Sequence, residues 1–118
     1  MSDTHEILVV DDDPDIREAL GGVLEQAGYD VVAFGDARAA LDWLDHGGLP
    51  DLVLLDLMMP GMNGWEFRAE LETRPKLAEL PVVVLTGARD GTGLKVNECL
   101  KKPVDLDVLL GAVDRWHR

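Results

Sequence analysis

One carboxylate lies inside an otherwise apolar stretch of the chain. Asp56 stands between Leu54–Leu55 and Leu57–Met59 in the segment DLVLLDLMMPGMNG, residues 51–64. An ionised carboxylate is unfavourable in apolar surroundings unless it is paired, bound to a metal or protonated. Asp56 is therefore a candidate for chemistry rather than for packing.

Other polar side chains stand at the ends of short apolar runs. Asp11, Asp12 and Asp13 follow the first run, Thr86 closes another, and Lys102 follows the last. A single aspartate after a strand is commonly a helix N-cap or a turn residue, so each one alone is weak support for a site. Several such residues at the ends of successive runs favour a shared site.

The residue types at these positions fit the binding and transfer of a phosphoryl group. Carboxylates that meet in one cleft raise one another's pKa unless a divalent cation neutralises them, and Mg²⁺ is the natural candidate. Lys102 would add a second positive charge and Thr86 a hydroxyl donor around Asp56. Carboxylates also act as nucleophiles that form aspartyl-phosphates, which makes Asp56 a candidate for covalent chemistry.

Brief apolar runs rich in β-branched residues alternate with segments of helical periodicity. The alternation predicts an α/β fold with a parallel sheet covered on both faces. Ligands of such sheets bind outside the carboxyl ends of the strands, so the candidate residues are expected to converge at one edge. The predicted strands occupy residues 6–10, 30–34, 51–55, 81–85 and 98–101.

Four apolar stripes predict helices, three between these strands and one after the last strand. The first begins at Asp13–Pro14, with Asp13 as its expected N-cap, and ends at Gly28. A second follows Asp36, also an expected N-cap. The third follows Gly64 and the last follows residue 103.

Composition and charge exclude several classes of protein. The 118 residues suit one domain, 1–118, with residues 1–4 as a tail. There are 23 acidic and 11 basic residues, and the resulting net charge of -12 argues against binding to nucleic acid or to an anionic membrane. No apolar run approaches the roughly 20 residues that span a bilayer, and the N-terminus lacks the pattern of a secretory signal. We expect a soluble, cytoplasmic protein.

The chain resembles the receiver domain of the two-component response-regulator family. The resemblance rests on ILVVDDDPDIR (7–17), LVLLDLMMPGMNG (52–64), VVVLTG (82–87) and LKKPVD (100–105), in the right order over nearly the whole chain. It implies a flavodoxin-like, doubly wound sheet of five parallel strands in the order 2-1-3-4-5. It also implies a signalling domain that catalyses only its own phosphorylation and dephosphorylation, not an enzyme that acts on other substrates.

The resemblance assigns a role to each candidate residue. Asp56 matches the phosphoacceptor, and Asp11 and Asp12 match the acidic pair that binds Mg²⁺ together with Asp56. Thr86 and Lys102 match the hydroxyl and the lysine that contact the phosphoryl group. The main-chain carbonyl of Met58 matches a further metal ligand. The implied partner is a sensor histidine kinase or a histidine phosphotransfer protein, and the downstream target is a protein that the sequence does not identify.

Two segments depart from the family pattern. Residues 87–97 are shorter than expected and contain three glycines, so we predict that the fourth helix of the family is short or missing here. Cys99 replaces an aromatic residue that the family often carries, and we expect it to be a small buried strand residue. Three histidines, His5, His46 and His117, show no ligand-like spacing and are expected in solvated or loop positions.

Two alternative functions compete with the receiver. A haloacid-dehalogenase-type phosphatase would also use an aspartyl-phosphate, but Met58 stands where such enzymes carry a second aspartate. A pseudo-receiver would be a protein interaction module that is never phosphorylated. The chain ends at Arg118, so we interpret it as a stand-alone receiver or as a fragment of a larger protein.

Overall fold

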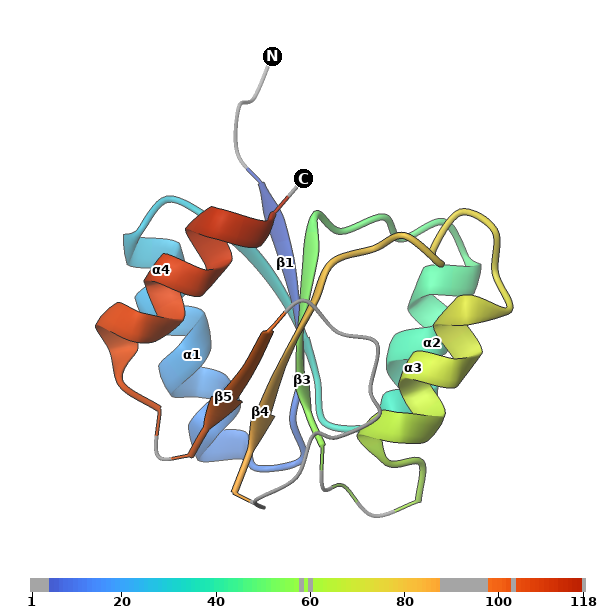
Figure 1. Ribbon diagram of the computed structural model, residues 1–118, viewed down its shortest axis with the longest axis horizontal. Coiled ribbons are helices and arrows are strands. Elements are labelled where there is room, and N and C mark those ends of the chain that lie inside the picture. Colours follow the sequence, from blue (N-terminus) through green and yellow to red (C-terminus); the bar gives the residue numbers. More distant parts are fainter. Residues whose placement is uncertain (1–4, 58, 60, 88–97, 103, 118) are drawn as a thin grey trace.

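Strands and helices follow one another along the chain in the computed structural model, which describes residues 5–57, 59, 61–87, 98–102 and 104–117 (Figure 1). Within these residues there are five strands and four helices. In chain order they are β1 (Glu6–Val10), α1 (Pro14–Gln26), β2 (Asp30–Phe34), α2 (Ala37–Asp45), β3 (Leu52–Asp56), α3 (Gly64–Glu72), β4 (Val82–Thr86), β5 (Glu98–Lys101) and α4 (Leu106–Trp116).

The five strands form one parallel sheet in the order β2-β1-β3-β4-β5, which confirms the predicted order. The predicted bounds of β3 and β4 were one residue too early, since these strands end at Asp56 and Thr86. This shift matters for the site. Asp56 and Thr86 are the final residues of their strands and pair in register with Leu85 and Lys101, so strand geometry fixes the positions of both.

The sheet separates two helical layers. Figure 1 shows α1 and α4 on one face of the sheet and α2 and α3 on the other. Successive residues of a strand point to opposite faces, so Ile7 and Val9 pack in the α1/α4 layer while Leu8 and Val10 pack in the α2/α3 layer. All five residues of β3 and of β4 are buried, which explains why these strands have no polar alternation in the sequence.

Side-chain caps fix where the helices begin. Asp13 accepts hydrogen bonds from the backbone N–H groups of Asp15 and Ile16 and caps α1, as predicted. Asp36 caps α2, which was also predicted. The caps of α3 and α4, Asn63 and Asp105, follow the same chemistry. Each helix therefore starts at a defined residue beside the carboxyl ends of the strands.

Cys99 is exposed, so the prediction that it is buried was wrong. It belongs to β5, an edge strand in which Leu100 is buried while Cys99 and Lys101 face outward. Period-two alternation places Cys99 on the side opposite Leu100. The preference of cysteine for the interior did not decide its position.

Two predictions lie outside the described residues. The short or missing helix was placed at residues 87–97, of which only Gly87 is described, and the N-terminal tail was placed at residues 1–4. None of the helices that the structure describes has the length and apolarity needed to cross a membrane.

Candidate functional site

The candidate site lies at the carboxyl ends of the strands, the lower edge of the sheet in Figure 1. β1 leads into Asp11 and Asp12, β3 ends at Asp56, β4 ends at Thr86, and β5 leads into Lys102. Four strand ends thus supply the five side chains predicted for the site. The remaining predicted residue, Met58, lies outside the described residues.

Three carboxylates form the centre of this site. One oxygen from each of Asp11, Asp12 and Asp56 lies within 4.8 Å of the other two. Asp11 and Asp56 are 1% and 5% exposed, whereas Asp12 is exposed. Three carboxylates this close repel one another, so the cluster suits a hard divalent cation that accepts oxygen ligands.

Lys102 is the positive charge of the site. Its Nζ lies 3.1 Å from Oδ2 of Asp11 and 3.5 Å from Oδ1 of Asp56. Its backbone N–H donates to the carbonyl oxygen of Thr86 at 2.8 Å, so the end of β4 positions the lysine. Burial alone would lower the pKa of Lys102, but the hydrogen bond and charge of Asp11, with a contribution from Asp56, raise that pKa above its ordinary value.

The backbone around Asp11 is held by several hydrogen bonds. The N–H of Asp11 donates to the carbonyl of Phe34 at 3.1 Å, and the N–H of Asp13 donates to Oδ1 of Asp11 at 2.9 Å. Arg17 donates from Nη1 to the carbonyl oxygen of Asp11 at 2.8 Å. Sequence reasoning missed Arg17, because one arginine near the start of an amphipathic helix gives no sign of such a contact.

The loop after β3 is closed against the strand. The N–H of Gly64, the first residue of α3, donates to the carbonyl of Leu57 at 2.9 Å. A Cβ at Gly64 would lie 2.8 Å from the Cα of Leu57 and 3.2 Å from the carbonyl oxygen of Asp56. Gly61 has a φ of 77°, a conformation that favours glycine. Both glycines therefore allow a tight loop beside Asp56.

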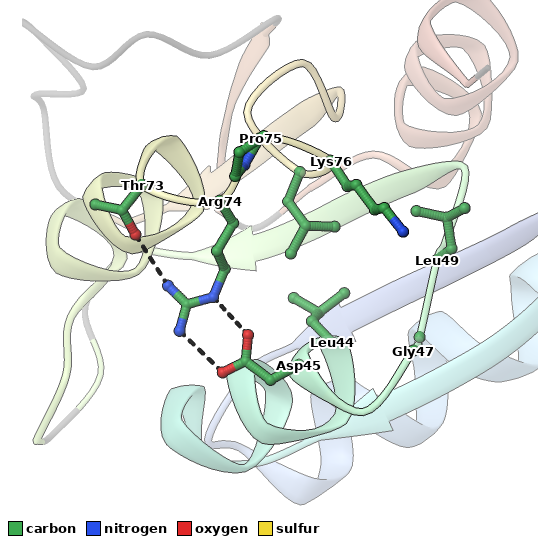
Figure 2. A pocket seen from close by; sticks show the side chains of 10 residues that line it. Leu44, Asp45, Gly47, Leu49, Thr73, Arg74, Pro75 and Lys76 are labelled. Carbon is green, nitrogen blue, oxygen red and sulfur yellow. Dashed lines mark hydrogen bonds and ion pairs between the residues drawn. The ribbon is translucent and has the colours of Figure 1, made fainter.

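A pocket lies at the opposite edge of the sheet, beside the amino-terminal ends of β3 and β4. This pocket has a volume of about 470 Å³. Figure 2 shows it between the end of α2 and the segment after α3, with Leu44, Leu49 and Pro75 in its lining. None of the predicted site residues lines it. It is separate from the carboxylate cluster.

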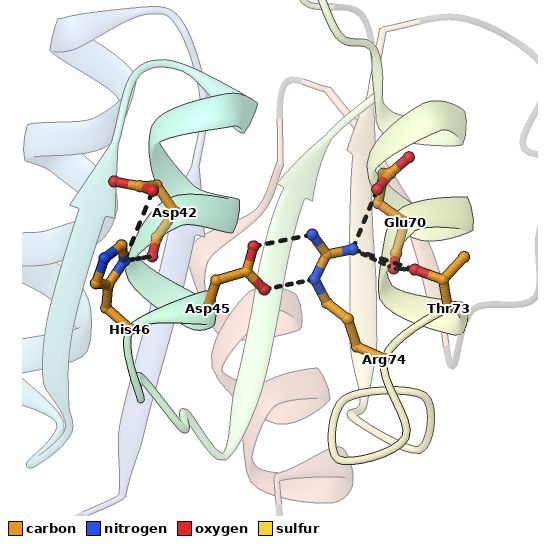
Figure 3. A network of polar contacts seen from close by, with 6 residues as sticks. All are labelled: Asp42, Asp45, His46, Glu70, Thr73 and Arg74. Atoms are coloured by element: carbon orange, nitrogen blue, oxygen red, sulfur yellow. Dashed lines mark hydrogen bonds and ion pairs between the residues drawn. The ribbon is translucent and has the colours of Figure 1, made fainter.

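Arg74 forms one wall of this pocket and joins α2 to the end of α3 (Figure 3). Its guanidinium binds both carboxylate oxygens of Asp45, at 2.6 and 2.9 Å, and reaches Glu70 at 3.1 Å. The hydrogen bond from Arg74 lowers the pKa of Asp45. Paired hydrogen bonds of this kind fix geometry as well as charge, so these residues tie the two helices together.

The predicted histidines do not enter the site. His46 is exposed, with its Nδ1 2.7 Å from the carbonyl oxygen of Asp42. His5 and His117 stack with ring centroids 4.0 Å apart, a contact between the start of β1 and the end of α4 that the sequence did not suggest. The two rings are tilted by 33° to one another, and Nδ1 of His5 lies 3.6 Å from Oδ2 of Asp51.

Comparison with known proteins gives one consistent result. The family model described as the response regulator receiver domain matches residues 7–114. Response regulator Rre1 from Synechocystis is 38% identical over 117 residues, which cover 92% of this chain and 50% of that protein. The chain therefore spans about half the length of this relative.

Solved structures agree in fold. The signal receiver domain of a histidine kinase from Syntrophus aciditrophicus has a TM-score of 0.89 and 31% identity, with coverage of 96% of this chain and 89% of that one. The chemotaxis response regulator CheY4 of Vibrio cholerae has a TM-score of 0.86 and 28% identity, with coverage of 95% and 98%.

Proposed function

Because this chain belongs to the response regulator receiver domain family, we propose that Asp56 accepts a phosphoryl group from a histidine kinase or a histidine phosphotransfer protein. The observation that carries the proposal is the position of Asp56. It ends a buried strand, shares the carboxylate cluster and lies 3.5 Å from the ammonium of Lys102. We further propose that the chain is one cytoplasmic domain that signals by a change of conformation.

Mg²⁺ fits the cluster as its cation. Oxygens of Asp11, Asp12 and Asp56 are close enough to contact one ion, and one or two carboxylates with retained waters are its usual protein ligands. When bound, Mg²⁺ would offset the charge of the carboxylates and of the phosphoryl oxygens. The carbonyl of Met58 is proposed as a further ligand by family resemblance alone.

The proposed transfer is a displacement at phosphorus. A carboxylate oxygen of Asp56 attacks the phosphorus of a phosphohistidine on the partner, so that a P–O bond forms while the P–N bond breaks. The electron pair of the broken bond stays on the imidazole nitrogen. Lys102 and Thr86 would donate hydrogen bonds to the phosphoryl oxygens. Water later hydrolyses the aspartyl-phosphate, which returns Asp56 and releases inorganic phosphate.

The partner needs a surface beside the site, because Asp56 itself is only 5% exposed. An apolar pocket of about 430 Å³ lies between α1 and the residues Lys102, Val104 and Leu106. Its lining includes Ile16, Ala19, Val104 and Leu106, and Lys102 forms its boundary with the carboxylates. We propose that a helical segment of the phosphohistidine protein packs here, with its phosphoryl group directed to Lys102.

Intact mass spectrometry after incubation with Mg²⁺ and a small phosphodonor tests the proposal. The wild type should gain the mass of one phosphoryl group, and Asp56→Asn should gain none. Asp36→Asn is the matched control, since it removes a carboxylate that caps α2 at the same edge of the sheet, and asparagine caps equally well. A wild type that gains no mass, or an Asp56→Asn protein that still gains it, would contradict the proposal.

No observation on the described residues favours the two alternatives. A pseudo-receiver is without support, because the five side chains expected for phosphorylation are all present at one edge of the sheet: Asp11, Asp12, Asp56, Thr86 and Lys102. The family match argues equally against a dehalogenase-type phosphatase.

A further inference from the structure

Arg17 makes a contact with the site that the proposed function does not use. It lies on α1 with a half-buried side chain, and its Nη1 donates to the backbone carbonyl of Asp11 at 2.8 Å. Hydrogen bonds from a charged donor are stronger than those between neutral groups. The bond therefore joins the first helix firmly to the backbone that carries the carboxylates.

The carbonyl that Arg17 binds belongs to the peptide unit between Asp11 and Asp12. A peptide unit is planar, so holding its oxygen also sets the direction in which the chain enters Asp12. Asp11 has other anchors, because it is buried and its N–H donates to Phe34. Asp12 is exposed, and burial does not hold its side chain. The described contacts restrain Asp12 through the two peptide units beside it: Arg17 holds the carbonyl of Asp11 on one side, and the N–H of Asp13 donates to Oδ1 of Asp11 on the other.

Gly35 provides the space that Arg17 needs. A Cβ at this position would lie 2.3 Å from Nη1 of Arg17 and 3.0 Å from its Cζ. The backbone of Gly35 does not itself demand glycine, since its φ is outside the positive range. The close approach of the guanidinium is therefore the physical reason for a glycine directly after β2.

We infer that Arg17 is a positioning residue of the carboxylate cluster. It holds the Asp11–Asp12 peptide plane so that the Asp12 carboxylate points toward Asp11 and Asp56, and Gly35 keeps the space for its guanidinium. The inference rests on the proposed binding of Mg²⁺ at this cluster. Partners that orient metal ligands without touching the metal commonly change metal affinity by about 10–100-fold when they are removed.

Removal of Arg17 has two opposing effects, and the test must separate them. Loss of the hydrogen bond should weaken cation binding, whereas loss of a positive charge nearby should strengthen it. Gly35→Ala separates the two, because the added methyl displaces the guanidinium but leaves its charge in the protein. The displaced group is the end of a flexible side chain, so the variant should still fold.

The experiment is a Mg²⁺ titration followed by backbone amide NMR shifts of the intact chain. The proteins are the wild type, Gly35→Ala, Arg17→Met and the double variant. Gly22→Ala is the matched control, since a Cβ there meets nothing within 4 Å. We expect Gly35→Ala to weaken Mg²⁺ binding about tenfold and Gly22→Ala to leave it unchanged. When Arg17 is already replaced by methionine, Gly35→Ala should not change the Mg²⁺ affinity further, because no guanidinium is left to displace.

A second readout needs no metal. The amide N–H of Asp12 lies in the peptide unit that Arg17 holds, so its NMR order parameter reports the restraint directly. We expect a value typical of rigid backbone, about 0.85, in the wild type and a clearly lower one in Gly35→Ala, while Gly22→Ala keeps the wild-type value.

The outcomes distinguish this inference from the proposed function. The inference is overturned if the Mg²⁺ affinity of Gly35→Ala is within twofold of the wild-type affinity. It is also overturned if Gly35→Ala lowers the affinity by the same factor in the presence and in the absence of Arg17. If the wild type binds no Mg²⁺ at millimolar concentration, the proposed function fails instead. The order parameter of Asp12 then decides alone whether Arg17 positions that residue.

Discussion

The ammonium group of Lys102 lies 3.1 Å from the buried carboxylate of Asp11, although 91 residues of sequence separate them. This pair connects the end of β1 to the end of β5, the two outermost points of the site. A buried carboxylate without such a partner would be strongly unfavourable. The lysine therefore stabilises the cluster of negative charges in addition to its proposed contact with phosphate.

The pKa of Lys102 should fall when Asp11 is replaced by asparagine. Burial lowers this pKa and Asp11 contributes most to raising it, so in Asp11→Asn only Asp56 is left to oppose burial and the pKa should fall. NMR titration of the Lys102 side chain measures the value in both proteins. An unchanged Lys102 pKa would show that the ion pair does not control its protonation.

The same pair predicts a pH dependence of stability. A lysine whose pKa is higher in the folded than in the unfolded protein stabilises the fold fully below the unfolded value, about 10.4, and loses this contribution as pH rises through the folded value. The free energy of unfolding should therefore decrease on the alkaline side more steeply in the wild type than in Lys102→Met. Urea denaturation between neutral and strongly alkaline pH compares the two slopes, and parallel curves would contradict the prediction.

Gly64→Ala should destabilise the protein by about 1–3 kcal/mol and slow its phosphorylation. The added Cβ meets the backbone of Leu57, which cannot move without shifting the neighbouring Asp56. Urea denaturation and the rate of mass gain measure the two effects. Gly111→Ala in α4 is the control, since its Cβ would meet only the end of the Arg115 side chain, at 3.9 Å, and should stabilise the helix by about 0.5–1 kcal/mol. A Gly64→Ala protein as stable as the wild type would argue against the close packing of the loop.

Arg74→Met should lower Tm by about 2–5 °C at neutral pH, because it removes the link between α2 and the end of α3. Arg74 lowers the pKa of Asp45. The stabilisation from this ion pair is therefore fully present at pH values above the ordinary aspartate pKa, and it is lost as the pH falls through the lowered pKa of the folded protein. The difference in Tm between variant and wild type should therefore shrink in strong acid. Arg38→Met removes an exposed arginine from α2 and should change neither Tm nor its pH dependence.

Cys99 should react with a maleimide in the folded protein to one label per chain. Its side chain is exposed, so the reagent can reach it. The neighbouring atoms remove part of the thiol's hydration, and this desolvation raises the pKa of the thiol. The reaction should therefore be slower at neutral pH than that of a free cysteine, and it should accelerate as pH rises. Intact mass measures the labelling without denaturant, and Cys99→Ser is the control. Labelling that requires denaturant would restore the original prediction of a buried cysteine.

Local patterns were sufficient to predict most of the fold. The buried strands β3 and β4 were visible as unbroken apolar runs, and Asp13 and Asp36 were recognisable as caps because they stand just before helical stripes. The convergence of Asp11, Asp56 and Lys102 followed from a rule about parallel sheets. The order of the strands came from resemblance, since no local signal specifies which strands are neighbours.

Contacts between distant side chains could not be predicted in the same way. The hydrogen bond from Arg17 to Asp11 depends on the space left by Gly35, and the pairing of Arg74 with Asp45 depends on how two helices meet. The exposure of Cys99 depends on its strand lying at an edge. Each of these is a property of tertiary packing, and a single sequence contains no periodic signal for it.

The division of the interior by the sheet has a consequence for engineering. The α1/α4 layer and the α2/α3 layer share no core side chain, because each strand residue contributes to one side only. Substitutions that are distant and share no partners usually combine additively. A library that repacks the α2/α3 layer for thermal stability could therefore be designed and screened separately from one that changes the α1/α4 layer, and the best members of each could then be joined in one chain.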